Sequence, residues 1–431
     1  MAYILESGAL PDIFETFESQ VRSYCRSYPA TFARAAGSVV EDASGRQFID
    51  FLSGCASLNY GHNDPDMKQA LIDHIAGDGI AHGLDLFTMA KAAFLEAFVT
   101  HVLQPQGLDH RVQFTGPTGA NAVEAALKLA RKITGRTNVI AFTNGYHGVT
   151  LGALAATGNR GNRIGPSLGL GGVSRFPYDG YLGTSVDTAD LLDRMLDDPS
   201  SGIDLPAAII VEAVQGEGGL NVARPEWLRR VAEAARRHGA LLILDEVQAG
   251  CGRAGDFFAF EAAGIMPDLI ALAKSLSGFG LPMSLLLIRP EHDVWLPGEH
   301  NGTFRGNNHA FVTARVAVEK FWTDSRFAEA VAGKADLLGQ RLAAISGQIP
   351  GTRVKGRGMI QGIDFGSGPL AAEVARRCHD AGLIIETSGP NGEVVKVLAP
   401  LTIPIDLFNR GLDILEEASL VVAASQRAAA E

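Results

Sequence analysis

The sequence predicts an α/β fold, with a mostly parallel sheet in a large domain and a smaller α+β domain. From about Val112 onward, short apolar runs alternate with segments of helical periodicity. The runs are apolar throughout, which indicates strands covered by helices on both faces, as in parallel sheets. Beyond about Trp322 the pattern changes to long helical segments with few strands, which favours a second domain.

Several segments can be assigned to individual elements. The clearest strand candidates are residues 139–142, 207–214, 241–246, 268–273 and 284–288. The segment 225–239 begins with a proline and ends on a glycine, as helices often do. Near the N-terminus, apolar residues from Ile13 to Val21 recur at helical spacing and predict one more helix.

Composition narrows the class of protein. The chain has 431 residues and a net charge of -11, with no basic run, so nucleic acid and anionic membrane surfaces are not expected partners. The N-terminus lacks the basic start of a signal peptide, and no apolar stretch is long enough to span a membrane. Four scattered cysteines indicate neither a disulfide framework nor a metal site. We therefore expect a cytoplasmic enzyme.

The segment from Thr115 to Gly135 is a candidate anion site. A Gly-Pro-Thr-Gly turn opens directly onto a helix, whose free N–H groups and dipole favour a phosphate. An ordinary capping turn is the alternative. The glycine-rich segment 167–172 does not follow a strand, and no GxxxxGK[ST] motif occurs, so a dinucleotide or nucleotide loop is disfavoured.

Three further candidates stand at predicted strand ends, where open parallel sheets bind ligands. Tyr146 and His147 follow one strand and could contact a planar ligand, or could belong to an ordinary loop. Lys274 follows another strand and could form a Schiff base, or could extend outward to solvent. Asp245 ends a third strand as a carboxylate that requires a cation.

Together these groups match the needs of pyridoxal 5'-phosphate. Its aldehyde requires a lysine, its pyridinium nitrogen a carboxylate, its phosphate a helix N-terminus and its ring an aromatic neighbour. Lys274 and Asp245 are accordingly the predicted catalytic residues.

The chain resembles the class III (omega-type) aminotransferases, which have the fold type I of pyridoxal phosphate enzymes. The resemblance rests on ordered motifs over nearly the whole length: "LNYGHNDP", "PTGANAVEAALKLAR", "NGYHG", "VEAVQGEGG", "LDEVQAGCGRAG", "LAKSLSGFGLPM" and "GTFRGNN". It implies a seven-stranded large-domain sheet. It also implies residues 1–60 as an N-terminal segment packing with the small domain, 61–322 as the large cofactor-binding domain, and 323–431 as the small domain.

The resemblance also implies roles for individual residues. Lys274 matches the Schiff-base lysine and proton shuttle, and Asp245 the acid on the ring nitrogen. The other implied cofactor-binding residues are Gly119, Ala120, Tyr146, His147, Glu212, Val247, Gln248 and Thr303. Thr303 matches a phosphate ligand supplied by the neighbouring subunit, which implies at least a homodimer.

The implied substrate site departs from the common family pattern. Glu217 resembles the glutamate that gates the substrate carboxylate site, and Lys396 stands where many members have an arginine. A Glu217–Lys396 gate is one hypothesis. In the other, Lys396 is a solvated strand residue and Arg305 binds the carboxylate. Cys55, at the entrance motif, differs from the expected small residue and leaves room for an altered amino acceptor.

Within the class, the chain is most similar to the diaminobutyrate–2-oxoglutarate aminotransferases, for example in "DGIAHGLDLFTMAK" and "GLIIETSGPNGEVVK". This similarity implies transfer of the amino group of L-glutamate to L-aspartate 4-semialdehyde, giving L-2,4-diaminobutyrate and 2-oxoglutarate. Alternatives are the same fold acting on another terminal amine or aldehyde, a regulatory module without turnover, and a nicotinamide-dependent dehydrogenase. Retention of both Lys274 and Asp245 argues against the second, and the absent dinucleotide fingerprint against the third.

Overall fold

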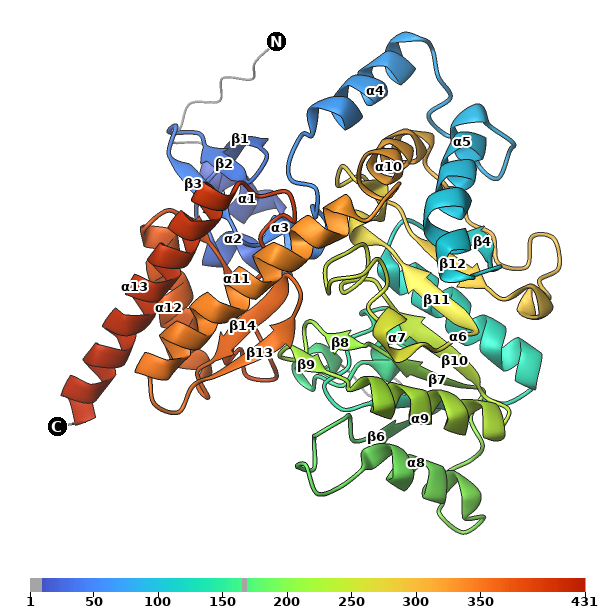
Figure 1. Ribbon diagram of the computed structural model, residues 1–431. Helices are drawn as coiled ribbons and strands as arrows, with labels where there is room; N and C mark the ends of the chain where they lie inside the picture. The colour runs from blue at the N-terminus through green and yellow to red at the C-terminus, as the bar shows by residue number, and fades with distance from the viewer. Residues whose placement is uncertain (1–9, 165–168, 431) are drawn as a thin grey trace.

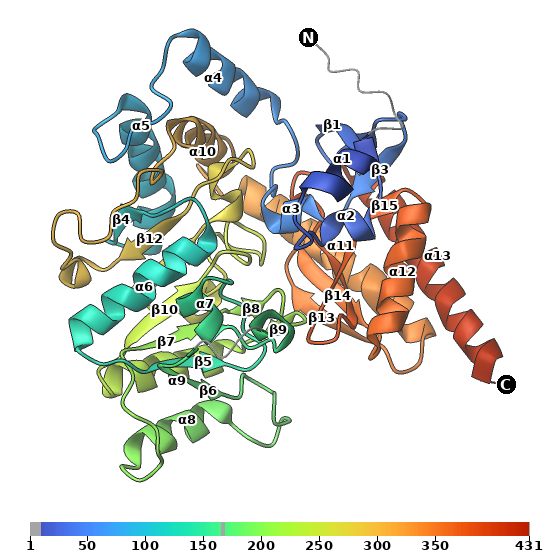
Figure 2. The same ribbon diagram turned by 180° about the vertical axis from the view of Figure 1, so that it is seen from behind.

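The computed structural model describes residues 10–164 and 169–430. Its centre is a seven-stranded sheet, which confirms the predicted α/β class (Figures 1 and 2). The strand order is β4 (Arg111–Phe114), β12 (Leu285–Ile288), β11 (Leu269–Leu272), β10 (Leu241–Asp245), β7 (Ala208–Val211), β5 (Val139–Phe142) and β6 (Val173–Phe176). The sheet is mostly parallel, since β12 alone runs antiparallel to its neighbours β11 and β4.

Both faces of this sheet are buried, as the continuously apolar strands require. Alternate strand residues, such as Ile243 and Leu244, belong to two different hydrophobic clusters. On one face, α6 (Gly119–Thr134) packs against β10, β11 and β12, with α7 (Leu151–Ala156) beside it. On the other, α9 (Pro225–Arg237) packs against β7 and β10.

The five predicted strands are present, with one correction. The run 207–214 is not a single strand, because β7 ends at Val211 and a short strand β8 (Val214–Gln215) pairs separately with β9 (Asn221–Val222). The break falls at Glu212, which is buried at the end of β7. Ser167 and Leu168, from the glycine-rich segment set aside above, lie outside the described residues.

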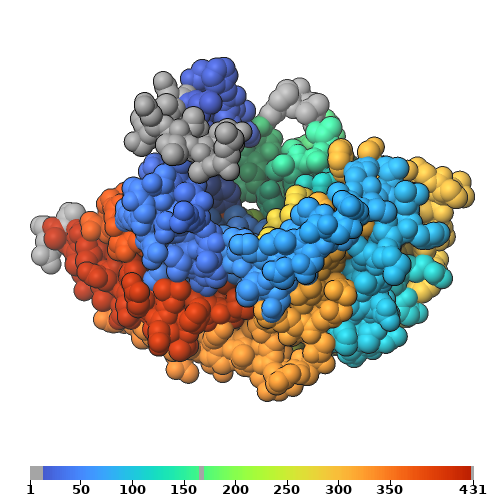
Figure 3. All heavy atoms as spheres, turned by 90° about the horizontal axis from the view of Figure 1, so that it is seen from above, coloured from blue at the N-terminus to red at the C-terminus, as the bar shows by residue number. Residues whose placement is uncertain are grey.

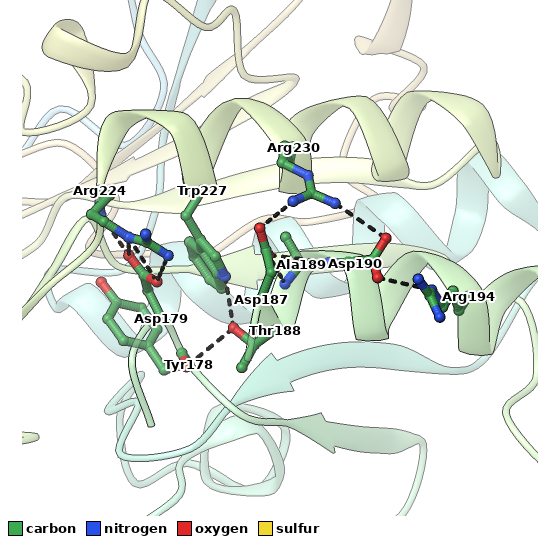
Figure 4. Close-up of polar contacts among 10 residues, drawn as sticks. All are labelled: Tyr178, Asp179, Asp187, Thr188, Ala189, Asp190, Arg194, Arg224, Trp227 and Arg230. Atoms are coloured by element: carbon green, nitrogen blue, oxygen red, sulfur yellow. Dashed lines mark hydrogen bonds and ion pairs between the residues drawn. The ribbon is translucent and has the colours of Figure 1, made fainter. Parts of the chain in front are cut away.

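A buried side-chain network ties α8 (Thr188–Asp197) and α9 to the end of β7 (Figure 4). The indole Nε1 of Trp227 donates to Oγ1 of Thr188 (2.8 Å), which donates to the carbonyl of Tyr178 (3.2 Å). The Tyr178 hydroxyl in turn donates to the carbonyl of Glu212 (2.8 Å). Surface ion pairs of Arg224 and Arg230 with Asp179, Asp187 and Asp190 flank the network. The two helices therefore fix the position of the backbone at Glu212.

The C-terminal region forms a second hydrophobic core around a four-stranded sheet. Its strand order is β13 (Arg353–Arg357), β14 (Ile360–Asp364), β17 (Val394–Val397) and β16 (Glu386–Ser388). The surrounding helices are α11 (Arg326–Gln348), α12 (Gly368–Asp380) and α13 (Ile405–Ala430).

The two ends of the chain share one further sheet. Here β1 (Phe32–Ala36), β2 (Val39–Asp42) and β3 (Gln47–Asp50) are followed by β15 (Leu383–Ile384), which pairs parallel with β3. Ile49 and Phe51 are buried in the same core as α11 to α13. The division into 1–60, 61–322 and 323–431 stays a prediction, and this shared sheet supports it.

The remaining helices come before the first strand of the large sheet or after its last strand in the chain. They are α1 (Leu10–Phe17), α2 (Tyr24–Ser27), α3 (Ser53–Ala56), α4 (Pro65–Ala76), α5 (Met89–Phe98) and α10 (Asn308–Phe321). The predicted N-terminal helix ends at Phe17 and does not reach Val21, whose side chain is exposed. Helical periodicity overstated this helix because the apolar stripe is not buried in the chain's own core. Among the described helices, none combines the length and apolarity needed to cross a membrane.

Candidate active site

Several predicted site residues, among them Tyr146, Asp245 and Lys274, lie at the carboxyl ends of β5, β7, β10 and β11, beside a cavity of about 1240 Å³. Figure 3 shows the surface hollowed between the blue N-terminal elements and the green and yellow segments. The cavity walls combine the N-terminal segment, the large-sheet loops and the C-terminal hairpin. They include Tyr24, Cys55, Tyr146, Glu217, Lys274 and Glu386. Adjacent parallel strands end at one edge of the sheet, which explains why residues so distant in sequence meet here.

Asp245 is held in place by two hydrogen bonds. Its Oδ2 lies 2.8 Å from Nδ1 of His147, and its Oδ1 accepts the backbone N–H of Val247 (3.1 Å). Both Asp245 and His147 are buried. Burial disfavours the imidazolium, but the hydrogen bond and charge of Asp245 outweigh it and raise the pKa of His147. Asp245 is thus held in a fixed orientation at the carboxyl end of β10.

A second buried acid organises the loop after β5. Glu212 accepts the backbone N–H of Tyr146 (2.9 Å) through Oε2. Burial raises the pKa of Glu212 to about 8, although the nearby His147 opposes this shift. Glu212 therefore holds Tyr146 at the cavity wall.

Lys274 occupies a strained position immediately after β11. Its φ is 53°, in the left-handed region that non-glycine residues rarely adopt. Its side chain lines the cavity. Within residues 10–164 and 169–430, no carboxylate lies at ion-pair distance from its Nζ. The lysine is therefore directed into the cavity without an anionic partner, as a Schiff-base lysine must be.

The predicted phosphate turn approaches the site closely. Helix α6 begins at Gly119, and the Thr118 side chain makes no capping hydrogen bond to its N–H groups. A Cβ at Gly119 would lie 2.7 Å from Cγ1 of Val247, and one at Gly148 would lie 2.7 Å from Cβ of Ala120. Gly119 therefore allows the turn to approach the loop after β10, and Gly148 allows the loop after β5 to approach the start of α6. The uncapped helix N-terminus is suited to bind a phosphate.

Gln248 offers an additional acceptor to a ligand. Its Nε2 donates to Oε1 of Glu217 (2.9 Å), while its own Oε1 is buried without a hydrogen-bond partner among the described residues. Buried polar atoms are rarely left unpaired in native proteins. A hydroxyl in the cavity would satisfy this oxygen. The turn at Gly119, the Gln248 oxygen, Asp245 and Lys274 together fit pyridoxal 5'-phosphate.

Lys396 lies between two carboxylates. Its Nζ is 2.8 Å from Oε1 of Glu217 and 3.0 Å from Oε1 of Glu386. Lys396 is 0% exposed, so the interpretation of Lys396 as a solvated strand residue is wrong. Burial alone would raise the pKa of Glu217, but Lys396 and Lys274 outweigh it and lower that pKa to about 2. Glu217 and Lys396 therefore form a charged pair, as the gate hypothesis requires.

Sequence reasoning missed Glu386 and Tyr24. Glu386 is directly opposite Lys396 in the antiparallel pairing of β16 and β17. The turn-forming segment Ser388–Gly392 between two apolar runs indicates such a hairpin, and its register would have placed the two charges side by side. The Tyr24 hydroxyl lies 2.6 Å from Sγ of Cys55 at the cavity wall. No sequence signal links that segment to the cavity.

Thr303 and Arg305 lie away from Lys274 within one chain. Thr303 is exposed in the loop before α10. Arg305 pairs with Asp85 and lines a separate cavity of about 400 Å³. The structure therefore does not bring Arg305 into the cavity that contains Lys274.

Fold and site together define a fold-type I transferase with a pyridoxal phosphate site. The class-III aminotransferase family model matches residues 22–419, and the chain belongs to this family of pyridoxal phosphate-dependent enzymes.

Relatives and solved structures agree with this assignment. The chain is 53% identical to a diaminobutyrate–2-oxoglutarate transaminase of Nocardia farcinica, over 94% of this chain and 93% of that protein. It is 54% identical to one of Vibrio cholerae, over 95% and 100%. Among solved structures, an ornithine aminotransferase of Toxoplasma gondii has a TM-score of 0.82 at 26% identity, covering 99% of this chain and 97% of that one.

Proposed function

We propose that this class III aminotransferase transfers the amino group of L-glutamate to L-aspartate 4-semialdehyde, forming L-2,4-diaminobutyrate and 2-oxoglutarate. The observation that carries the proposal is the buried Glu217–Lys396–Glu386 cluster beside Lys274, which provides groups for both a carboxylate and an ammonium. The names of the relatives that align along almost the whole chain support the same substrates.

Pyridoxal phosphate, when bound, supplies the electron sink that stabilises a carbanion at the substrate amine carbon. Asp245, which His147 orients, would bind the ring nitrogen and keep it protonated. Tyr146 and Val247 would contact the ring, and the N-terminus of α6 would bind the phosphate through Gly119 and Ala120. Lys274 accepts and returns the proton at the amine carbon.

The gate between Glu217 and Lys396 lets one cavity accept two different substrates. With the pair closed, Lys396 is neutralised and the cavity admits the chain of the semialdehyde. With Glu217 turned toward Gln248, to which it is already hydrogen bonded, Lys396 keeps Glu386 as its one remaining carboxylate partner in the cluster and can also bind the α-carboxylate of glutamate. A lysine serves here as a point charge rather than a bidentate fork.

A homodimer completes the site. Large apolar side chains are exposed along the segment between α4 and α5 and in the loop before α10, notably Ile80, Leu86, Phe87, Met89 and Phe304. Such a patch on a protein of this size favours burial against another protein surface. A second copy of the chain covering it would let the partner subunit's Thr303 reach the phosphate. The enzyme then contains two shared sites.

The test is a panel of amino acceptors with L-glutamate as donor, with each aminated product identified by mass spectrometry. L-Aspartate 4-semialdehyde, succinate semialdehyde and glutamate 5-semialdehyde are compared by kcat/KM. The highest value is expected for aspartate semialdehyde. A higher value for another aldehyde would replace the proposed acceptor while leaving the reaction class intact.

A further inference from the structure

The charges around Lys396 do not balance. Glu217 and Glu386 both lie within 3.0 Å of its Nζ, so the cluster contains two carboxylates and one ammonium. Glu386 is fixed in this position because it pairs with Lys396 across β16 and β17, which directs the two side chains to the same face of the sheet. The cluster therefore leaves one negative charge that a ligand could neutralise.

Of the two carboxylates, Glu386 is the one that lacks hydrogen-bond donors at normal distance and geometry among the described residues. It is only 8% exposed, yet its Oε1 makes no hydrogen bond of good geometry with any described residue, despite its proximity to Lys396. Its Oε2 makes two long contacts within residues 10–164 and 169–430, at 3.4 Å from the Tyr24 hydroxyl and 3.8 Å from Sγ of Cys55. Burial also raises the pKa of Glu386, which indicates an anion in need of further stabilisation. This carboxyl lines the cavity that contains Lys274.

We propose that Glu386 binds the α-ammonium of the amino-acid aldehyde and of the diamino acid formed from it, and thereby determines specificity. The inference rests on the proposed function, since it assumes that a terminal amine reacts while a second amine stays intact. In an extended four-carbon substrate, that second nitrogen lies a few bonds from the reacting carbon, on the side of the carboxylate. Glu386 lies beside Lys396, the residue assigned to carboxylate binding during the glutamate half of the cycle.

Glu217 is less suited to this role. Its Oε1 already accepts hydrogen bonds from both Lys396 and Gln248. In the proposed gate, Glu217 changes position between these two partners from one half-reaction to the other. Glu386, in contrast, is held on a strand. A fixed carboxylate is the better recognition group because it is oriented before the substrate enters.

The experiment compares two substrates that differ only by the α-ammonium: L-2,4-diaminobutyrate and 4-aminobutyrate, each with 2-oxoglutarate as acceptor. Wild type, Glu386→Gln and Glu393→Gln are assayed. Glu393 is a matched control, because it lies on the same hairpin and contacts the backbone N–H of Asn391 instead of the cluster. Melting temperature and cofactor absorbance establish that each variant folds and binds cofactor.

The ratio of kcat/KM for diaminobutyrate to that for aminobutyrate should fall by about 30-fold or more in Glu386→Gln, and should not change in Glu393→Gln. The KM for 2-oxoglutarate should stay the same or fall, because Lys396 loses a competing carboxylate. The ratio of the dissociation constant for diaminobutyrate to that for aminobutyrate, measured by calorimetry in a Lys274→Ala background without turnover, should rise in Glu386→Gln to a similar extent.

Two negative results are distinguishable. If wild type does not convert diaminobutyrate, the proposed function fails. If wild type converts it and Glu386→Gln keeps the wild-type substrate ratio, the role of Glu386 is overturned while the proposed function stands. An equal loss for both substrates would likewise overturn it, since that result indicates a structural role.

Discussion

Nδ1 of His147 lies 2.8 Å from Oδ2 of Asp245, and both residues are buried where β5 and β10 end. The imidazole fixes the direction of the carboxylate, and the carboxylate stabilises the protonated imidazole. An acid held in this way can keep a pyridinium nitrogen charged throughout a reaction. The first prediction follows from this contact.

Asp245→Asn should lower kcat by about 100- to 10,000-fold, on the scale of ~3–5 kcal/mol, because the amide keeps the shape and loses the charge. Glu246→Gln is the matched control, since the neighbouring carboxylate accepts the N–H of Ala259 and is not among the residues that line the cavity. Steady-state kinetics with glutamate and aspartate semialdehyde measure the effect. Near wild-type turnover in Asp245→Asn would exclude Asp245 from the cofactor site.

Borohydride should attach the cofactor irreversibly to Lys274 and bleach the yellow colour of the purified enzyme. Peptide mapping by mass spectrometry identifies the modified residue. Lys274→Ala should show no such labelling and should lose nearly all turnover, because the covalent link and the proton shuttle disappear together. Label on a different lysine would contradict this assignment.

Thr303→Ala should weaken cofactor affinity by about 10-fold, the scale of a lost hydrogen bond to a charged group. Mixing it with Lys274→Ala under conditions that exchange subunits should create hybrids with one complete site and one doubly altered site. Cofactor titration of the mixture measures the recovery. If no site of normal affinity returns on mixing, the shared-site model is incorrect.

Lys396→Met should raise the KM for glutamate and 2-oxoglutarate by about 10-fold or more, with a smaller effect on the semialdehyde. The reason is that the carboxylate of these two substrates needs the Lys396 ammonium, which becomes available when Glu217 turns away. Lys396→Arg keeps the charge and should largely preserve both constants. Equal changes for all three substrates would refute the gate, and Arg305→Ala would then be the variant to compare.

The buried Glu246 leads to a prediction of how the stability of the fold depends on pH. Burial raises its pKa from an ordinary 4.5 to about 8, so the folded protein binds more protons than the unfolded chain between these values. Stability from this group is therefore complete below about pH 4.5 and is lost as the pH rises toward 8. Glu246→Gln should remove this loss, so at pH 8 its free energy of unfolding should exceed that of wild type by an amount on the order of a few kcal/mol, and its melting temperature should be higher. If the stability of Glu246→Gln relative to wild type were the same at pH 5.5 and at pH 8, the raised pKa of Glu246 would be contradicted.

The residues at the strand ends were predictable because the sequence shows both the buried strands and the polar residues that follow them. Apolar runs identify buried parallel strands, and Asp245 and Lys274 follow two of these runs directly. Parallel strands end at a common edge, so these side chains converge without further long-range information. The same reasoning applies to Tyr146 and His147 after β5.

The substrate end of the cavity was less predictable. Whether Lys396 is buried depends on Glu386 and Glu217 being close enough to neutralise it, and those contacts come from different parts of the chain. The contact between Tyr24 and Cys55 likewise depends on where a short N-terminal helix lies relative to α3. Local periodicity contains no information on either distance.

The sheet shared by β1, β2, β3 and β15 has a consequence for biosynthesis. During translation, β3 emerges early, while β15 and the hairpin with Glu386 and Lys396 emerge only near the end. The large sheet has all its strands by then and can form its own core on the ribosome. Because β3 pairs with β15, the sheet of the first strands is complete only after β15 has been synthesised. The substrate end of the cavity is therefore assembled last. A nascent chain can therefore build the cofactor-binding edge before it can discriminate between substrates.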